Sequence, residues 1–398
     1  MKPARFRLRR PHPSPKPDRL LITVLLAAVA LAALALLLPS AHAQTPTPAD
    51  PQAQTPDSGG PNTDNGPIVI PKKKEPADEP PPPAPAELKV KNPNGETYSL
   101  RVDVPIVNLN VNVILDKTHQ FVPGLKAANF LVLEDGVEQK VDTVRITQTP
   151  ITAVMLLEFA ANSYVLINDM RNSAVTFFRS LRPDDYIAVM TYDLRTHILS
   201  DFSNNKEVIA ESLNSLTMPM FTDTDVFDAL YETLDRVSRI EGRKYVILIG
   251  SGRDTFSKIN LDKILAKIKA TPNVTIFTIS TGAILNEMSS GGGIRGLNYL
   301  QAQNQMKTFA EMTGGLYFAP VFQGELPDDF SAINNSIRNQ YLLTYRPTNP
   351  KNDGSYRKIK VLLVDNEGHP LQMQDEKGKP LKYSIIARDG YNAKLPVD

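Results

Sequence analysis

The sequence contains no cysteine among its 398 residues. This absence excludes disulfide bonds, thiolate metal sites, a cysteine nucleophile and a lipid anchor on an N-terminal cysteine. Histidine is also scarce: beyond the first 43 residues only His119, His197 and His369 remain, and no two of them have the spacing of metal ligands. The sequence has no phosphate-binding P-loop, and no G-x-S-x-G motif precedes a predicted helix, so a serine hydrolase of that type is not expected.

Most of the chain has no excess of positive charge. The first 43 residues carry seven Lys or Arg and one Asp, a net charge of +6, whereas the whole chain has +1, which leaves −5 for the remainder. A mildly acidic remainder offers no basic surface to a phosphate backbone, so we expect no nucleic-acid partner.

The N-terminus has the three parts of a secretory signal. A basic head precedes an apolar run at 20–38, and small residues stand at Ala41 and Ala43. This pattern predicts a signal peptide over residues 1–43, cleaved after Ala43. The apolar run is nearly long enough to cross a bilayer, so an uncleaved membrane anchor is the alternative. Both interpretations place the rest of the chain outside the cytoplasm, either periplasmic or secreted, and membrane contact would come only through residues 20–38.

Residues 44–87 are rich in Pro, Thr, Ala, Gln and Asp and include a run of four prolines. Such a composition cannot bury enough apolar surface to order itself. We therefore predict a disordered, Pro-rich linker that is stiffened by polyproline segments.

Alternating apolar residues predict antiparallel strands in two stretches that are far apart in the sequence. In the first, a period-two pattern and the Asp135-Gly136 turn between apolar runs indicate an antiparallel unit over residues 97–147. Strand patterns return near the C-terminus. We expect the two groups to pair as one β-sandwich, built from residues 88–149 and 326–392.

Between these stretches, residues 150–325 alternate apolar strands with helices. Continuous apolar runs such as 153–157 and 245–249 are typical of strands covered on both faces. Strands that alternate with helices predict an α/β fold with a doubly wound, mostly parallel sheet, here inserted into the β-sandwich. The glycine-rich segment 291–296 fits G-x-G-x-x-G but lies far from the preceding strand, so we predict a loop and not a dinucleotide site.

Several motifs resemble those of von Willebrand factor type A domains, and more narrowly of exported "VWFA-related" proteins of acidobacterial type. The resemblance covers about residues 97–392. Its segments are the strand ending at Glu158, the loop at 222–230, the strand leading to 250–255, and the flanking motifs at 130–136, 340–347, 354–359 and 387–391.

The resemblance implies a metal-ion-dependent adhesion site at the carboxyl ends of the strands. In this family a D-x-S-x-S motif, a later threonine and an aspartate hold Mg²⁺ or a similar ion, whose coordination a partner's carboxylate completes. The present chain departs from that pattern: Glu158 replaces the first Asp, Ala160 and Asn162 replace the two serines, Thr224 matches, and Ser251 replaces the last Asp.

These substitutions predict a degenerate site. Ala160 offers no oxygen, and the longer side chain of Glu158 displaces its carboxylate, whereas Mg²⁺ requires near-octahedral geometry. We therefore expect no bound metal, and the residual candidate ligands for Mg²⁺ or Ca²⁺ are Glu158, Asn162 and Thr224. A looser, Ca²⁺-tolerant site is the alternative, with ligands from Asp223, Asp225 and Asp254.

The function we expect is extracytoplasmic adhesion or protein–protein binding, without enzyme activity. The binding surface would be formed by the loops at 158–164, 219–226, 250–258 and 282–298, which contain the degenerate site positions Glu158, Ala160, Asn162, Thr224, Asp225, Ser251 and Asp254. Four apolar residues of this region are either exposed for recognition or tucked into the core: Met218, Met220, Phe221 and Phe256. The competing class is an exported hydrolase acting on envelope polymer, with Glu158 and either Asp225 or Asp254 as an acid/base pair.

Overall fold

The computed structural model describes residues 86–91, 97–102, 105–146, 149–288 and 294–393. The predicted signal or anchor over 1–43 and nearly all of the predicted linker lie outside the described residues. Within the described ranges, no helix combines the length and the apolar character needed to span a membrane.

The α/β part contains a six-stranded sheet in the order β12-β11-β10-β7-β8-β9. All neighbouring strands pair in parallel except β9, which runs antiparallel to β8 at one edge. The strands are β7 (Thr152–Glu158), β8 (Tyr186–Tyr192), β9 (Thr196–Ser203), β10 (Lys244–Gly250), β11 (Val274–Ser280) and β12 (Tyr317–Phe318). The prediction of a doubly wound, mostly parallel sheet is therefore confirmed.

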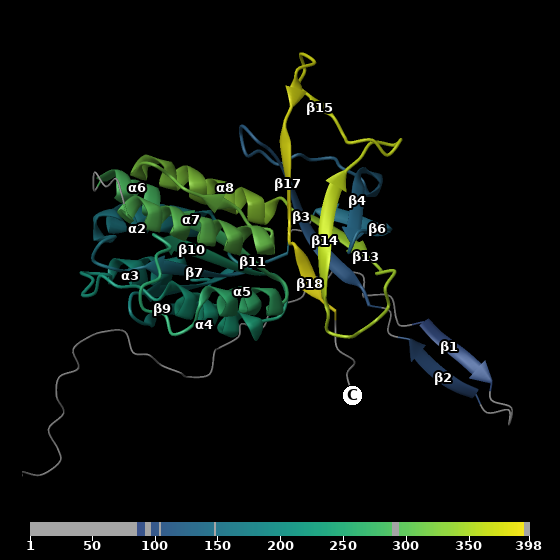
Figure 1. Cartoon of the computed structure of the whole chain (residues 1–398), viewed down its shortest axis with the longest axis horizontal. Helices are drawn as coiled ribbons and strands as arrows, with labels where there is room; N and C mark the ends of the chain where they lie inside the picture. Colours follow the sequence, from purple (N-terminus) through teal and green to yellow (C-terminus); the bar gives the residue numbers. More distant parts are fainter. Residues whose placement is uncertain (1–85, 92–96, 103–104, 147–148, 289–293, 394–398) are drawn as a thin grey trace, which may run out of the picture. The chain divides into compact units, whose positions relative to one another are not determined.

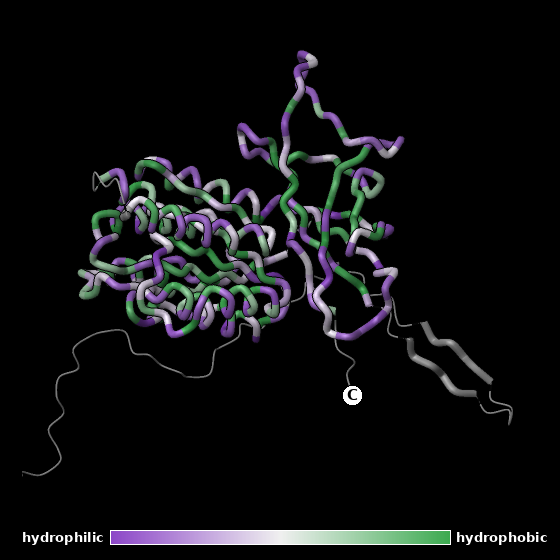
Figure 2. Tube along the Cα trace, in the orientation of Figure 1, coloured by the Kyte–Doolittle hydropathy of each residue, from purple (hydrophilic) through white to green (hydrophobic). Residues whose placement is uncertain are grey.

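Every residue of β7, β10 and β11 is buried, because helices cover both faces of the sheet. Alternate residues of a strand belong to two separate cores: Met155 packs in one cluster and its neighbour Leu156 in the other. Figure 1 shows α2 and α8 on one side of the sheet and α4 and α5 on the other, and Figure 2 shows the apolar central strands between them. The helices are α2 (Ile167–Ser180), α3 (Lys206–Asn214), α4 (Val226–Ser238), α5 (Leu261–Ala270), α6 (Gly282–Met288), α7 (Ile294–Thr313) and α8 (Leu326–Arg338), with short 3₁₀ turns η1 (Ala127–Asn129), η2 (Tyr164–Leu166) and η3 (Gln323–Glu325).

The prediction of a loop over 282–298, including the glycine-rich 291–296, is wrong for the part that is described. Residues 282–288 form α6, and α7 already begins at Ile294. Gly296 therefore lies within the first turn of a helix, where a single glycine costs only about 1 kcal/mol relative to alanine. The sequence predicts a helix only over the C-terminal part of α7, at 306–312, because the start of the helix has apolar side chains on a second face: Leu297 is exposed, whereas Met306 is buried.

The remaining strands form two four-stranded antiparallel sheets around one apolar core, a β-sandwich. Strand β13 pairs with β3, placing Leu343 opposite Leu109, and β14 pairs with β4, placing Val361 opposite Val132. These registers confirm the predicted pairing of N-terminal with C-terminal strands. The sheets are β17-β3-β13-β6 and β18-β14-β4-β5, built from β3 (Val107–Leu115), β4 (Phe130–Glu134), β5 (Val137–Gln139), β6 (Val141–Ile146), β13 (Tyr341–Tyr345), β14 (Tyr356–Leu363), β17 (Tyr383–Ala387) and β18 (Gly390–Asn392).

Two small hairpins complete the described strands. One joins β15 (Met373–Gln374) and β16 (Pro380–Leu381), and the other joins β1 (Ala86–Lys91) and β2 (Thr97–Val102). The antiparallel unit predicted over 97–147 is therefore wrong at its start, because β2 pairs with β1 and not with a strand of the sandwich.

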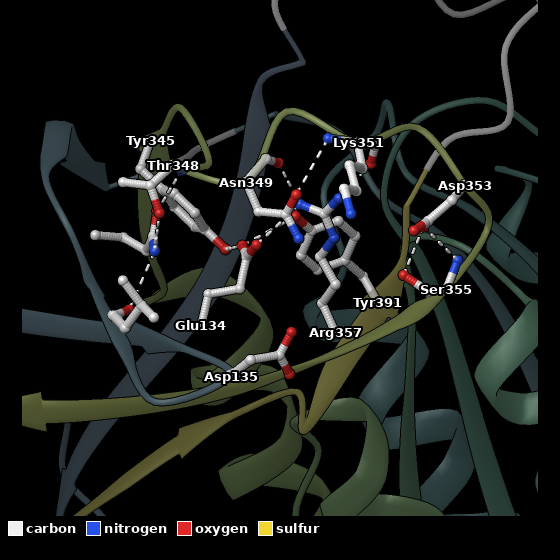
Figure 3. A network of polar contacts seen from close by, with 12 residues as sticks. Glu134, Asp135, Tyr345, Thr348, Asn349, Lys351, Asp353, Ser355, Arg357 and Tyr391 are labelled. Carbon is white, nitrogen blue, oxygen red and sulfur yellow. Dashed lines mark hydrogen bonds and ion pairs between the residues drawn. The ribbon is translucent and has the colours of Figure 1, made fainter.

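A buried polar network lies inside the sandwich (Figure 3). The carboxylate of Glu134 on β4 forms an ion pair with Arg357 on β14 and accepts hydrogen bonds from the hydroxyls of Tyr345 and Tyr391. The Arg357 guanidinium also donates to the carbonyl oxygens of Asn349 and Lys351. Both charges thus have the several partners that a buried ion pair requires.

Candidate functional site

The parallel sheet brings the predicted site residues together at the carboxyl-terminal ends of its strands, which we call the carboxyl edge. Strands β7 and β10 pair so that Leu157 lies opposite Ile249, and the next residues along the two strands are Glu158 and Gly250. The loop before α4 reaches the same edge, because a helix that connects parallel strands begins where the preceding strands end. Figure 1 shows this edge at the left of the view, near α3 and α6.

Glu158 and Ser251 form the closest contact of the site. The backbone N–H of Ser251 donates to Oε2 of Glu158 at 2.6 Å, and its hydroxyl donates to the same oxygen at 2.7 Å. Both residues are almost completely buried. Burial raises the pKa of Glu158, although the hydrogen bonds from Ser251 oppose the shift. The site therefore favours an uncharged Glu158 more than water does.

A third residue, Tyr192, lies beside this contact. It belongs to the neighbouring strand β8, where it pairs with Glu158. A Cβ atom on Gly250 would lie 2.5 Å from the Tyr192 hydroxyl and 2.7 Å from both Cβ and Oε2 of Glu158. Only glycine fits between the two side chains. Burial, followed by the nearby carboxylates of Glu158 and Asp225, raises the pKa of Tyr192, so the phenol stays protonated.

Thr224 and Asp254 are both engaged in contacts between loops. The Thr224 hydroxyl donates to the carbonyl oxygen of Arg253. A carboxylate oxygen of Asp254 accepts from the hydroxyl of Ser257 and, at 3.3 Å, from the backbone N–H of Phe227 in the first turn of α4. Asp254 therefore serves as an anionic partner at the start of this helix.

Asp225 is a second acid of the site whose burial raises its pKa. It is 5% exposed, and its Oδ1 is buried without a hydrogen-bond partner among the described residues. Burial, followed by the charges of Asp228, Asp193 and Asp254, raises the pKa of Asp225 to about 7. Asp225 and Asp228 also line a cavity of about 300 Å³, but Asp228 uses its carboxylate to accept from the backbone N–H groups of Lys258 and Ile259.

Ala160 and Asn162 lie in the turn after β7. Ala160 is fully buried, and its carbonyl oxygen accepts from the hydroxyl of Ser163 at 2.9 Å. Asn162 keeps a buried Oδ1 without a hydrogen-bond partner among the described residues, as does Oε1 of Glu158.

Backbone hydrogen bonds connect the three loops of this edge. The N–H of Ala161 donates to the carbonyl oxygen of Phe221 at 2.7 Å, which links the first loop to the second. The N–H groups of Thr255 and Phe256 donate to the carbonyl oxygen of Thr224 at 2.9 and 3.0 Å, which links the second to the third. The Glu158–Ser251 contact links the first to the third, so protein atoms alone join all three loops.

A family model of the von Willebrand factor type A domain matches residues 162–310. The α/β part of the chain is a von Willebrand factor type A domain. A domain of this type supports a role in protein–protein interaction. A comparison with curated proteins gives no match.

Solved structures with this fold are similar to the chain at low sequence identity. A von Willebrand factor type A protein from Catenulispora acidiphila is 8% identical over 73% of this chain and 75% of its own, with a TM-score of 0.38. The von Willebrand factor domain of the type V pili tip protein Mfa5 from Porphyromonas gingivalis is 13% identical over 48% and 96%, with a TM-score of 0.38. The PilB minor pilin from Streptococcus sanguinis is 11% identical over 48% and 62%, with a TM-score of 0.37.

The residues of the type A domain do not fit the cation that the family's site holds. Mg²⁺ takes about six oxygens and favours ionised carboxylates. Ala160 offers no side-chain oxygen, and Ser251 directs its N–H and hydroxyl at Glu158, which has the one carboxylate among the five family positions 158, 160, 162, 224 and 251. The looser site proposed at Asp223, Asp225 and Asp254 fits no better. Across the described ranges, no group of three or more His, Asp or Glu side chains is placed to hold a metal ion.

The three acids nominated as an acid/base pair, Glu158, Asp225 and Asp254, do not share a cleft. Glu158 is 1% exposed and lies behind Ser251, so its carboxylate cannot reach a bound polymer. Asp254 is held by Phe227 and Ser257, which leaves Asp225 as the only one of the three nominated acids among the residues that line the 300 Å³ cavity.

Apolar side chains gather at this same edge. Met218, Met220, Phe221 and Phe256 are 69%, 85%, 44% and 60% exposed, which decides between the two predicted alternatives in favour of exposure. Of the fourteen large apolar side chains that are exposed in the described part of the chain, eleven belong to segments at the carboxyl ends of the strands. We call these eleven the apolar crown: Tyr164, Val165, Met218, Met220, Phe221, Phe256, Met288, Leu297, Leu300, Val321 and Phe322.

Seven residues of the apolar crown were not predicted from the sequence. Tyr164 and Val165 lie in η2, and Leu297 and Leu300 lie in the first turns of α7, where a helical pattern would assign them to a core. Val321 and Phe322 follow the two-residue strand β12. Ala283 and Glu287 of α6, Leu300 of α7 and Val321 line one hollow, which places these segments together.

Proposed function

We propose that this chain is an exported binding protein whose type A domain recognises another protein through the apolar crown, without a coordinated cation and without enzyme activity. The observation that carries the proposal is the concentration of exposed apolar side chains at one edge of the domain. Exposed apolar clusters of this kind are characteristic of interaction sites, since isolated exposed residues would be scattered over the surface.

The contacts beneath the crown support a cation-free mode of binding. In the family's usual site, a cation holds the loops together and binds the partner's carboxylate. Here the Glu158–Ser251 contact and the backbone hydrogen bonds of Ala161 and Thr224 already join the loops. Loops that are fixed before binding lose less conformational entropy when the partner docks. The substituted positions thus have a structural role, and recognition depends on shape and apolar contact.

The test compares the full chain with a crown variant and a matched control. The crown variant is Met218→Ser/Met220→Ser/Phe256→Ser, and the control is Val208→Ser, which removes an exposed apolar side chain on α3. Each apolar side chain buried in an interface contributes about 1.5–3 kcal/mol, so the triple variant should weaken capture of the partner from an envelope fraction by more than about 100-fold.

The control should capture the same partner as the unaltered chain, with or without EDTA. Capture that EDTA abolishes and Mg²⁺ restores would contradict the cation-free mode. Capture that the crown variant retains in full would contradict the crown as the binding surface. Circular dichroism of each variant verifies that the domain stays folded.

A further inference from the structure

Arg388, which directly follows β17, is a cation without a counter-ion among the described residues. Its Nε atom is buried and has no hydrogen-bond partner in this part of the chain, and no described carboxylate forms an ion pair with its guanidinium. Burial lowers the pKa of Arg388, which reflects the loss of hydration around its charge.

Arg357, which is buried, and Arg338, which is partly buried, differ from Arg388 in this respect. Arg357 binds Glu134 and two carbonyl oxygens, and Arg338 forms an ion pair with Asp185. A buried guanidinium that lacks an acceptor is costly, and proteins keep such groups rarely. Arg388 is partly buried and has no acceptor among the described residues, so its guanidinium is available to a bound anion.

Arg388 lines a cavity of about 270 Å³, and none of the described residues that line it is acidic. The other cationic side chains of the cavity are already engaged: Arg357 pairs with Glu134, and the ammonium of Lys269 lies 5.3 Å from the centre of the Tyr356 ring. Side-chain amides of Asn108, Asn352 and Asn392 supply further donors, and proline and aliphatic side chains supply an apolar wall.

We propose that this cavity binds a small organic acid, whose carboxylate pairs with the Arg388 guanidinium. A planar guanidinium matches a carboxylate through two parallel N–H···O bonds. One uncommitted positive charge suits a monoanion better than a phosphate dianion, and the apolar wall suits a short carbon chain. The volume lies just below the usual range for ligand sites, about 300–1,000 Å³, so the ligand is small.

The test uses the full chain and three probes: butyrate, the neutral isostere butyramide, and inorganic phosphate. Calorimetric titration should detect saturable binding of butyrate and none of butyramide. Arg388→Met removes the charge while keeping most of the apolar stem, and it should weaken butyrate binding at least about tenfold, the equivalent of about 1.4 kcal/mol. Arg346→Met, an exposed arginine outside the cavity, is the matched control and should leave binding unchanged.

Arg388→Lys keeps the charge but loses the planar fork, and it should give intermediate affinity if Arg388→Met proves unstable. Equal binding of butyrate and butyramide, or full butyrate binding by Arg388→Met, would overturn the proposal. Tighter binding of phosphate than of butyrate would overturn the assignment to a carboxylate. The crown variant should bind butyrate normally, so the outcome is independent of the proposed function.

Discussion

The Nη1 atom of Arg357 lies 3.0 Å from Oε1 of Glu134, and both side chains are almost entirely excluded from solvent. The two residues belong to β14 and β4, which come from opposite ends of the chain and lie side by side in one sheet. This buried ion pair therefore connects a strand from the N-terminal part of the sandwich with a strand from its C-terminal part (Figure 3).

Removing one member of that pair should destabilise the sandwich strongly. Arg357→Met leaves the Glu134 charge buried without its counter-ion, which costs about 3–5 kcal/mol. Arg346→Met is the control, because the Arg346–Asp142 pair is half exposed and contributes less than about 1 kcal/mol. Urea unfolding of both variants measures the difference, and equal losses for the two would contradict the assigned role of the buried pair.

The unaltered chain should bind Mg²⁺, Mn²⁺ or Ca²⁺ no more tightly than about millimolar, since its site lacks the required oxygens. Restoring the family pattern with Glu158→Asp, Ala160→Ser, Asn162→Ser and Ser251→Asp should create measurable divalent binding in a calorimetric titration. Adding Thr224→Ala to this set should remove the gain. Sub-millimolar binding by the unaltered chain, abolished by Thr224→Ala, would show that the site is not degenerate.

Gly250→Ala should destabilise the type A domain by about 1–3 kcal/mol, the usual cost of overpacking. The added methyl group would meet the Tyr192 hydroxyl and the Glu158 side chain, both closer than normal contact. Combining the change with Tyr192→Phe removes one of the two clashes and should recover part of the loss. Thermal unfolding of the single and double variants provides the measurement, and a single variant as stable as the parent would refute the packing argument.

The stability of the type A domain should fall between about pH 4 and pH 7. Asp225 has a pKa of about 7 in the folded chain, against an ordinary value of 3.8, so the folded state holds its proton more tightly than the unfolded state does. The stabilisation of the folded state by protonated Asp225 is complete below about pH 4 and is lost as the pH rises through 7. Asp225→Asn should flatten this part of the pH profile in urea unfolding, whereas Asp223→Asn, an exposed neighbour, should retain the parental slope.

The sequence pattern was sufficient for the strands of the sheet and for the sandwich. Runs such as Ala153–Leu157 are apolar at every position because both faces are covered, and the alternation in β3 reports one covered face. The rule that a half-buried strand needs a partner sheet is consistent with the predicted grouping of the late strands with the 97–147 unit, whereas the pairing of β13 with β3 in particular comes from the structure.

The helix α6, the first turns of α7 and the contacts of single polar atoms could not be predicted from this pattern. An amphipathic signal fails at the start of α7, since Leu297 and Leu300 are exposed opposite a buried face. The position of Ser251 beside Glu158 depends on the register of β7 and β10, and the isolation of Arg388 depends on which carboxylates lie nearby. The contact of Ser251 with Glu158 and the isolation of Arg388 depend on residues that are far apart in the sequence, so neither can be predicted from a short segment of it.

The insertion of the type A domain between β6 and β13 imposes an order on folding. Strands β3 and β6 flank β13 in the finished sheet, so the two N-terminal strands have no neighbour to join them until synthesis has passed the whole inserted domain. The type A domain, whose strands all lie within one continuous stretch of sequence, can assemble first. A nascent chain arrested just before β13 would therefore display two open strand edges beside a completed globule, and that intermediate is the stage at which aggregation threatens this protein most.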